Sequence, residues 1–120
     1  MQTRTGSCHC GAVVFEVELE DGLQNLRRCN CSLCRRKGAI MAGVPVEKLK
    51  VVVGEDQLSL YQWNKNIARH YFCKHCGIYT HHQRRSNPAE FGFNVACIDG
   101  VDPLALENVG LSDGASMSLD

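Results

Sequence analysis

The sequence predicts a single mainly β domain, residues 1–120, with short helices at most and with metal sites that reinforce its core. Around Phe15, apolar and polar residues alternate, which is the period of a half-buried strand. No window beyond Lys50 repeats apolar residues about every 3.6 positions, so long helices are not expected. Seven of the eight cysteines fall into three tight clusters, as is typical of metal sites.

The first strand is predicted at Phe15–Leu19, where apolar residues alternate with glutamates, and Asp21-Gly22 ends it. A short helix is predicted from about Ser32 through Arg36, before a second strand at Ile40–Val44. Pro45–Leu49 predicts one helical turn, because proline presets φ at the start of a helix. The remaining strands are predicted at Val51–Val53, Leu58–Trp63, Ala68–Phe72, Ile78–His82 and Phe91–Ile98.

The cysteine clusters are Cys8-His9-Cys10, Cys29-Asn30-Cys31-Ser32-Leu33-Cys34 and Cys73-Lys74-His75-Cys76-Gly77. Thiols one or two residues apart rarely pair as disulfides, because the bridge needs a wider separation of Cα atoms. They can converge on one metal ion. A disulfide framework is the alternative, since eight is an even number. The first eleven residues contain no apolar signal core, so we expect a reducing, cytoplasmic compartment, where metal thiolates prevail.

Four of these cysteines are expected to form a closed structural zinc site. Cys73-x-x-Cys76-Gly77 is typical of a zinc knuckle, in which the glycine supplies a positive φ. One knuckle offers two ligands, and Cys8 and Cys10, expected just before the first strand, are the pair available to complete it. Their union would close a long loop, where a cross-link restricts the unfolded chain most.

The other three clustered cysteines, Cys29, Cys31 and Cys34, would then hold a metal with one corner left for water or substrate. Zinc is favoured by ligand softness and tetrahedral geometry, and the spacing does not match a four-cysteine iron site. The basic residues on both sides would favour ionised sulfur, and Arg35 and Arg36 are candidates for binding an acidic substrate. These basic residues are Arg27, Arg28, Arg35, Arg36 and Lys37. Two alternatives remain open: a fourth protein ligand that closes the site, and a merely solvated basic face.

Among the histidines, the adjacent pair His81 and His82 is the most informative. Neighbouring strand residues point to opposite faces, so one of the pair could approach the open metal as a proton shuttle or weak ligand. The unclustered Cys97, in a predicted apolar strand, is expected to be a buried and inert thiol. Tyr61 and Trp63 are expected to be core residues.

Composition excludes several function classes. The chain has 13 basic and 13 acidic residues and a formal net charge of zero, so no overall field would attract nucleic acid. Aromatic residues do not interleave with basic ones as in single-strand binders. The apolar stretches are too short to span a bilayer. The tail from Asp113 is small and polar, and we expect it to be loose at its end.

The three cysteine motifs and their neighbours resemble the glutathione-dependent formaldehyde-activating enzyme family, whose domain also occurs in centromere protein V. The resemblance runs from Gly6 to about Gly114 and includes Asn94–Asp99, which is similar to the family's final strand. It implies a tent of coiled antiparallel sheets and two zinc ions per chain. By position, Cys8, Cys10, Cys73 and Cys76 would be structural ligands, and Cys29, Cys31 and Cys34 catalytic ones.

The resemblance further implies a zinc-dependent carbon–sulfur lyase that adds the thiol of glutathione to formaldehyde, or to a related small aldehyde, giving an S-hydroxymethyl adduct. The competing hypothesis is a non-catalytic β module in which two structural zincs support a surface for a protein partner.

Overall fold

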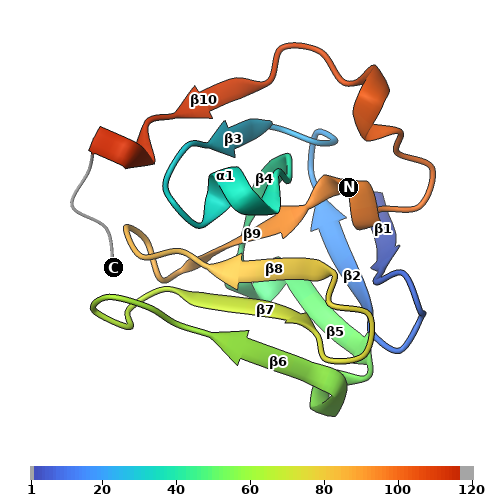
Figure 1. The fold of residues 1–120 in the computed structure, drawn as a ribbon. Helices are drawn as coiled ribbons and strands as arrows, with labels where there is room; N and C mark the ends of the chain where they lie inside the picture. Colours follow the sequence, from blue (N-terminus) through green and yellow to red (C-terminus); the bar gives the residue numbers. More distant parts are fainter. Residues whose placement is uncertain (1, 117–120) are drawn as a thin grey trace.

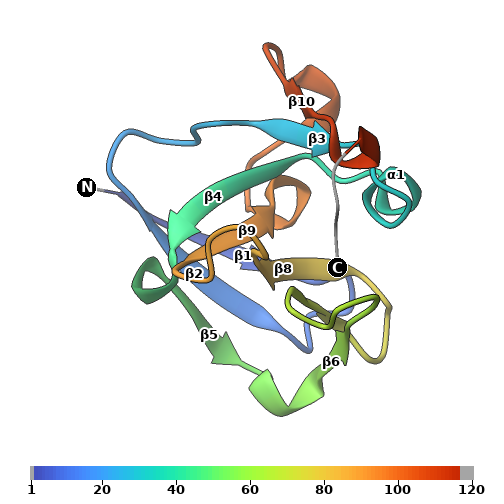
Figure 2. The same cartoon turned by 90° about the vertical axis from the view of Figure 1, so that its left-hand side faces the viewer.

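The computed structural model describes residues 2–116 and is mainly β, as predicted (Figure 1). One sheet has the strand order β1-β2-β5 and the other the order β10-β3-β4-β9-β8-β7-β6. Figures 1 and 2 show β3 and β10 together at one edge of the larger sheet, with α1 beside β3, and β6 at the other edge. The strands are β1 Gln2–Ser7, β2 Val14–Leu19, β3 Arg27–Cys29, β4 Met41–Pro45, β5 Leu49–Val53, β6 Leu58–Tyr61, β7 Arg69–Cys73, β8 Tyr79–Gln83, β9 Glu90–Asn94 and β10 Gly110–Ser112.

The helical segments are short. The α-helix α1 spans Cys34–Lys37 and ends at Gly38, whose φ of 67° is the left-handed conformation that glycine tolerates. The predicted turn after Pro45 is the 3₁₀ helix Val46–Lys48, with Pro45 as its N-cap. The other 3₁₀ helices are Glu55–Gln57, Val95–Cys97, Pro103–Ala105 and Gly114–Ser116. Within residues 2–116, the structure contains no helix with the length and apolarity that a membrane span requires.

The core lies between the two sheets. On β2, Phe15, Val17 and Leu19 are buried while the intervening glutamates are exposed, which confirms the predicted alternation. These side chains share one apolar cluster with Phe93 of β9 and with residues of β4. Gly6 on β1 leaves room for Phe15, because a Cβ at Gly6 would lie 2.5 Å from the ring. The core therefore joins residues from both halves of the chain.

Three strands were not predicted, namely β1, β3 and β10. They are short or polar, so they carry no alternating apolar pattern and depend on neighbouring strands for their hydrogen bonds. The presence of β1 corrects the expectation for Cys8 and Cys10, which lie in the turn of the β1–β2 hairpin rather than before the first strand. The pair β3–β10 is parallel, whereas the resemblance implied antiparallel sheets.

Two predicted strands end earlier than expected. The strand from Leu58 ends at Tyr61, before Trp63. The strand predicted at Phe91–Ile98 ends at Asn94, because the Asn94 side chain accepts a hydrogen bond from the Ala96 amide and caps a 3₁₀ helix. Cys97 thus lies in a helical turn and not in a strand. In the polar tail, Gly114–Ser116 form a 3₁₀ helix, and the end of the tail, 117–120, lies outside the described residues.

Candidate metal centres and their cavity

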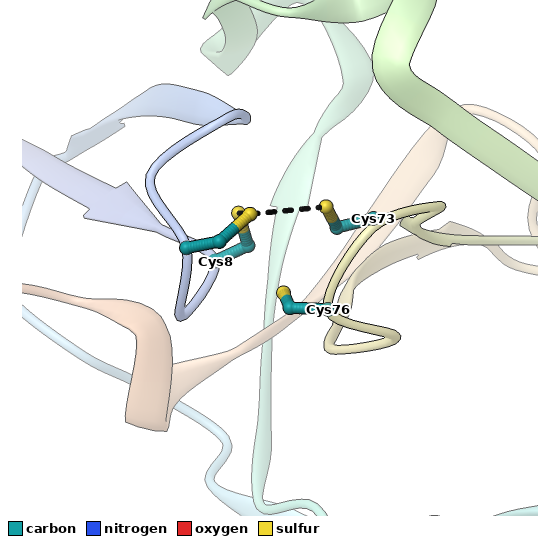
Figure 3. Close-up of side chains that lie close together, drawn as sticks. Cys8, Cys73 and Cys76 are labelled. Carbon is teal, nitrogen blue, oxygen red and sulfur yellow. Dashed lines mark hydrogen bonds between the residues drawn. The ribbon is translucent and has the colours of Figure 1, made fainter.

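The four cysteines predicted to share a site come together between two turns (Figure 3). Cys8 and Cys10 come from the β1–β2 turn, and Cys73 and Cys76 from the β7–β8 turn. Their sulfurs all lie within 4.8 Å of one another. The Sγ of Cys10 lies 3.7 Å from that of Cys8 and 3.6 Å from that of Cys73.

Local backbone conformation aims these sulfurs at a common point. Gly11 and Gly77 adopt positive φ values of 81° and 77°, which let each turn fold back tightly. The amide of Val13 donates to the Sγ of Cys8 at 3.3 Å, and the amide of His75 donates to the Sγ of Cys73 at 3.4 Å. Such amides stabilise thiolates, as in zinc knuckles.

The spacing of the sulfurs fits zinc. Four thiolates at about 2.3 Å from a tetrahedral ion lie about 3.8 Å from one another, close to the measured separations. Desolvation opposes ionisation of Cys76, but the amides of Cys10 and Ile78 outweigh it and lower the pKa of this thiol to about 6. The Ala12 amide favours the Cys10 thiolate, yet desolvation and the neighbouring sulfurs raise its pKa to about 11. A cation is what would allow all four to ionise together.

The second cluster contains Cys29, Cys31 and Cys34, and their sulfurs also lie within 4.8 Å of one another. Cys29 ends β3, Cys31 lies in the turn that follows, and Cys34 begins α1. The amide of Cys31 donates to the Sγ of Cys29 at 3.5 Å, and the amide of Cys34 donates to the Sγ of Cys31 at 3.3 Å. Within residues 2–116, no histidine or carboxylate joins these three sulfurs. The donor set therefore supplies three corners of a tetrahedron.

Lys37 places a positive charge next to this three-cysteine cluster. Its Nζ lies 3.3 Å from Nδ1 of His70 and 3.7 Å from the centroid of the Tyr79 ring. Burial lowers the pKa of Lys37, and the negative charge of Cys34 and its two neighbouring cysteines opposes that shift. Burial also raises the pKa of Cys34. Ionised sulfur at this position consequently depends on nearby cations.

A cavity of about 280 Å³ opens beside the three-cysteine cluster, and all three cysteines line it. This volume is just below the roughly 300–1,000 Å³ that encloses drug-sized ligands, so the cavity is sized for a small molecule or for part of a larger one. The other lining residues include Arg27, Leu33, Met41, Trp63, His70, His82, Arg84, Arg85 and Ser112.

The arginines of the cavity are not the two named from the sequence. Arg35 and Arg36 are exposed on α1, and neither lines the cavity. Arg27, Arg84 and Arg85 line it instead. Burial, together with the nearby Arg84 guanidinium, lowers the pKa of Arg27. Arg84 also pairs with the carboxylate of Glu90. The role of Arg35 and Arg36 in substrate binding remains a prediction.

His81 and His82 face opposite sides of β8, as expected. His82 lines the cavity, whereas His81 is buried on the other side, stacked on Tyr71 at 4.8 Å between ring centroids. Burial lowers the pKa of His82 well below its usual value, and Lys37 adds to the effect. The ring is therefore a neutral imidazole near pH 7.

The His82 ring is held from three sides. The Tyr79 hydroxyl lies 2.5 Å from its Nδ1, and burial raises the pKa of Tyr79, so the hydroxyl stays protonated and donates. The ring stacks on His70 at 5.4 Å between centroids. Gly92 makes room behind it, since a Cβ there would lie 2.4 Å from Cε1 of His82. Because Nδ1 accepts the hydrogen bond from the Tyr79 hydroxyl, the proton of the neutral ring lies on Nε2, which is left as the donor.

Two other expectations can be placed. Cys97 is buried, as expected, with its Sγ 3.6 Å from the Tyr79 carbonyl, and burial raises its pKa to about 12. That this thiol is inert stays a prediction. Tyr61 was expected in the core, but it is 48% exposed. It lies on β6, an edge strand of the larger sheet. Trp63 lines the cavity.

Sequence reasoning missed Arg84, Arg85, His70 and Trp63 as cavity residues. These four residues are distant from Cys34 in the sequence. His70 lies on β7, and the other three lie in the segments before and after the β7–β8 hairpin. Folding of this hairpin places all four beside the cysteine cluster. The one local signal was that Arg84 and Arg85 closely follow His82.

Comparison with known proteins agrees with the fold. A family model described as glutathione-dependent formaldehyde-activating enzyme matches residues 3–108. The crystal structure of a protein from Rhodobacter sphaeroides is similar to this chain, with 55% sequence identity and a TM-score of 0.86. The match covers 90% of this chain and 99% of that one.

Proposed function

Because the chain belongs to the glutathione-dependent formaldehyde-activating enzyme family, we propose that it adds the thiol of glutathione to formaldehyde at the cavity beside Cys29, Cys31 and Cys34. The observation that carries the proposal is the unequal division of sulfur between the two clusters. One cluster has four cysteines and the other has three next to a cavity.

The reaction requires a bond to form between the thiol sulfur and the carbonyl carbon. The C=O π bond breaks, and the thiol proton finishes on the oxygen, so the product is S-hydroxymethylglutathione and no oxidant or reductant is consumed. The reverse reaction cleaves a carbon–sulfur bond, which makes the enzyme a carbon–sulfur lyase.

We assign zinc to both clusters on the chemistry of their donors. Cys8, Cys10, Cys73 and Cys76 would hold a structural ion. Zinc held by Cys29, Cys31 and Cys34 would serve as a Lewis acid that lowers the pKa of a thiol or polarises a carbonyl. All eight cysteines are free thiols in the structure, which supports a reducing, cytoplasmic setting.

The residues around the cavity supply orientation and proton handling. Glutathione carries two carboxylates, and the guanidinium groups of Arg27, Arg84 and Arg85 at the cavity wall are suited to bind them. His82 would donate a hydrogen bond to the aldehyde oxygen as negative charge develops there, because its neutral ring keeps a donor. Its three-sided packing preorganises this donor before substrate arrives.

The direct test measures S-hydroxymethylglutathione formation at equilibrium by exchange NMR, with and without the zinc-loaded protein. We expect formation to be faster than the spontaneous rate and to return to it in Cys31→Ser. An unaccelerated rate with fully loaded protein would remove this reaction.

Cobalt substitution separates the enzyme from a protein-binding module. Cobalt in the three-cysteine cluster should change its visible spectrum when glutathione is added, while cobalt in the four-cysteine cluster should not. Two equally inert ions, neither responding to a thiol, would indicate that both sites are structural.

A further inference from the structure

Asn30 lies between two members of the three-cysteine cluster, and its side chain bonds to the far end of the chain. Its Nδ2 donates to Oδ1 of Asp113 at 2.9 Å, and its Oδ1 accepts from the Ala115 amide at 2.8 Å. Its backbone amide donates to the Ser112 carbonyl at 3.2 Å. One residue thus makes three hydrogen bonds to a segment more than eighty positions away.

The partner segment, residues 110–116, is part of the same site. Its first three residues, Gly110–Ser112, form β10 and pair in parallel with β3, which places Ser112 opposite Cys29. Ser112 and Gly114 line the cavity together with the three cysteines. β10 pairs with β3 alone in the sheet order, so the segment is attached at one side only. The three bonds of Asn30 continue that attachment beyond the strand, over the loop that bears Cys31.

We infer that Asn30 is a positioning residue that locks the C-terminal segment onto the cysteine loop and thereby fixes the geometry and metal affinity of Cys29, Cys31 and Cys34. Residues that orient metal ligands without touching the ion commonly change affinity by about 10- to 100-fold when mutated. Cys29 and Cys31 flank Asn30 directly, so a shift of its backbone moves both sulfurs. The inference rests on the proposed function only in taking these three cysteines as a metal site.

Asn30 suits the role because it offers a donor and an acceptor at once. Alanine offers neither. Aspartate in its place would face Asp113 as a second carboxylate and lose the donated bond. Exchanging the two residues, Asn30→Asp with Asp113→Asn, restores a donor at position 113 and keeps the acceptor for the Ala115 amide.

The experiment follows the release of each zinc ion from the full-length protein to a chromophoric chelator. In Asn30→Ala and in Asn30→Asp, we expect one ion to leave about tenfold faster or more, with release of the other unchanged. In the Asn30→Asp/Asp113→Asn double variant, the rate of zinc release should return most of the way to that of the wild type. Cobalt spectra should show the same pattern, with altered bands only for the three-cysteine cluster.

Asp102→Ala is the matched control. The Asp102 side chain accepts a hydrogen bond from the Leu104 amide at 3.0 Å at the start of a 3₁₀ helix. Asp102 belongs to neither cysteine cluster and does not line the cavity, so this variant should release both ions as the wild type does. Equal acceleration of both ions in Asn30→Ala would mean general destabilisation and would overturn the inference, as would unchanged release or failure of the double variant to recover. If the wild type binds only one zinc, the metal assignment in the proposed function fails instead.

Discussion

At the residue scale, His81 and His82 show how one step along a strand changes a side chain's chemistry. They are chemically identical and adjacent, yet β8 directs His82 to the cavity and His81 into packing against Tyr71 and Phe91. The alternation was predictable from the strand. The sequence did not predict which face of β8 borders the cavity, because that depends on where β3 and α1 lie.

His82→Phe should slow S-hydroxymethylglutathione formation by about 100-fold, the usual cost of losing one preorganised donor. Phenylalanine keeps the ring that stacks on His70, so zinc content should not change. The control is His81→Phe, on the opposite face of the same strand, which should leave the rate unaltered. Equal rate losses in both variants would indicate that β8 is merely disturbed.

His81 should also make folding stability depend on pH. Burial lowers the pKa of His81 from 6.5 to about 4, so the unfolded chain takes up a proton first as pH falls between those values. The contribution of His81 to the free energy of unfolding is therefore complete above pH 6.5 and is lost as the pH falls towards 4. The loss is about 3 kcal/mol at most. Urea unfolding across this range should show a flatter pH dependence for His81→Phe than for the wild type. Identical slopes for the two proteins would contradict the assignment.

At the element scale, the predicted strands were those whose apolar residues alternate towards a core, such as β2. β3 and β10 escaped detection because a three-residue strand has no measurable period and forms only when a neighbour supplies hydrogen bonds. The end of β9 was also missed, since the cap by Asn94 competes with the apolar residues that follow.

Glycines on paired strands show how an element positions the site. Gly92 on β9 and Gly43 on β4 are opposite each other in register. Gly92→Ala should destabilise the protein by about 1–3 kcal/mol and slow the reaction, because the added Cβ meets the His82 ring at 2.4 Å. Gly43→Ala is the control, since its Cβ would have no neighbour nearer than 3.7 Å. Thermal unfolding and the exchange NMR assay measure both effects, and similar results for the two variants would contradict this account.

At the scale of the whole molecule, the two cysteine clusters differ in how much chain they connect. Cys8 and Cys10 lie beside Cys73 and Cys76, which are distant in the sequence, whereas the other three clustered cysteines lie within six consecutive residues. A metal in the first cluster restricts the unfolded chain far more than one in the second.

Cys73→Ser should therefore lower stability by about 4 kcal/mol, the chain-entropy estimate for a cross-link over a loop of this size. Cys31→Ser should abolish the proposed reaction but lower stability much less, because its cluster closes no long loop. Chemical denaturation of the zinc-loaded proteins compares the two. A larger loss in Cys31→Ser than in Cys73→Ser would refute this division of roles.

The sequence by itself determined the grouping of the sulfurs, because the spacing of Cys29, Cys31 and Cys34 is a local property and the knuckle at Cys73 needs a second pair. It also determined the alternation that builds β2. Only the tertiary structure decided what surrounds the three-cysteine cluster: Arg84 and His82 come from β8 and the residues after it, and Asp113 comes from the end of the described chain. Those contacts arise from strand pairing between distant segments, which no local pattern encodes.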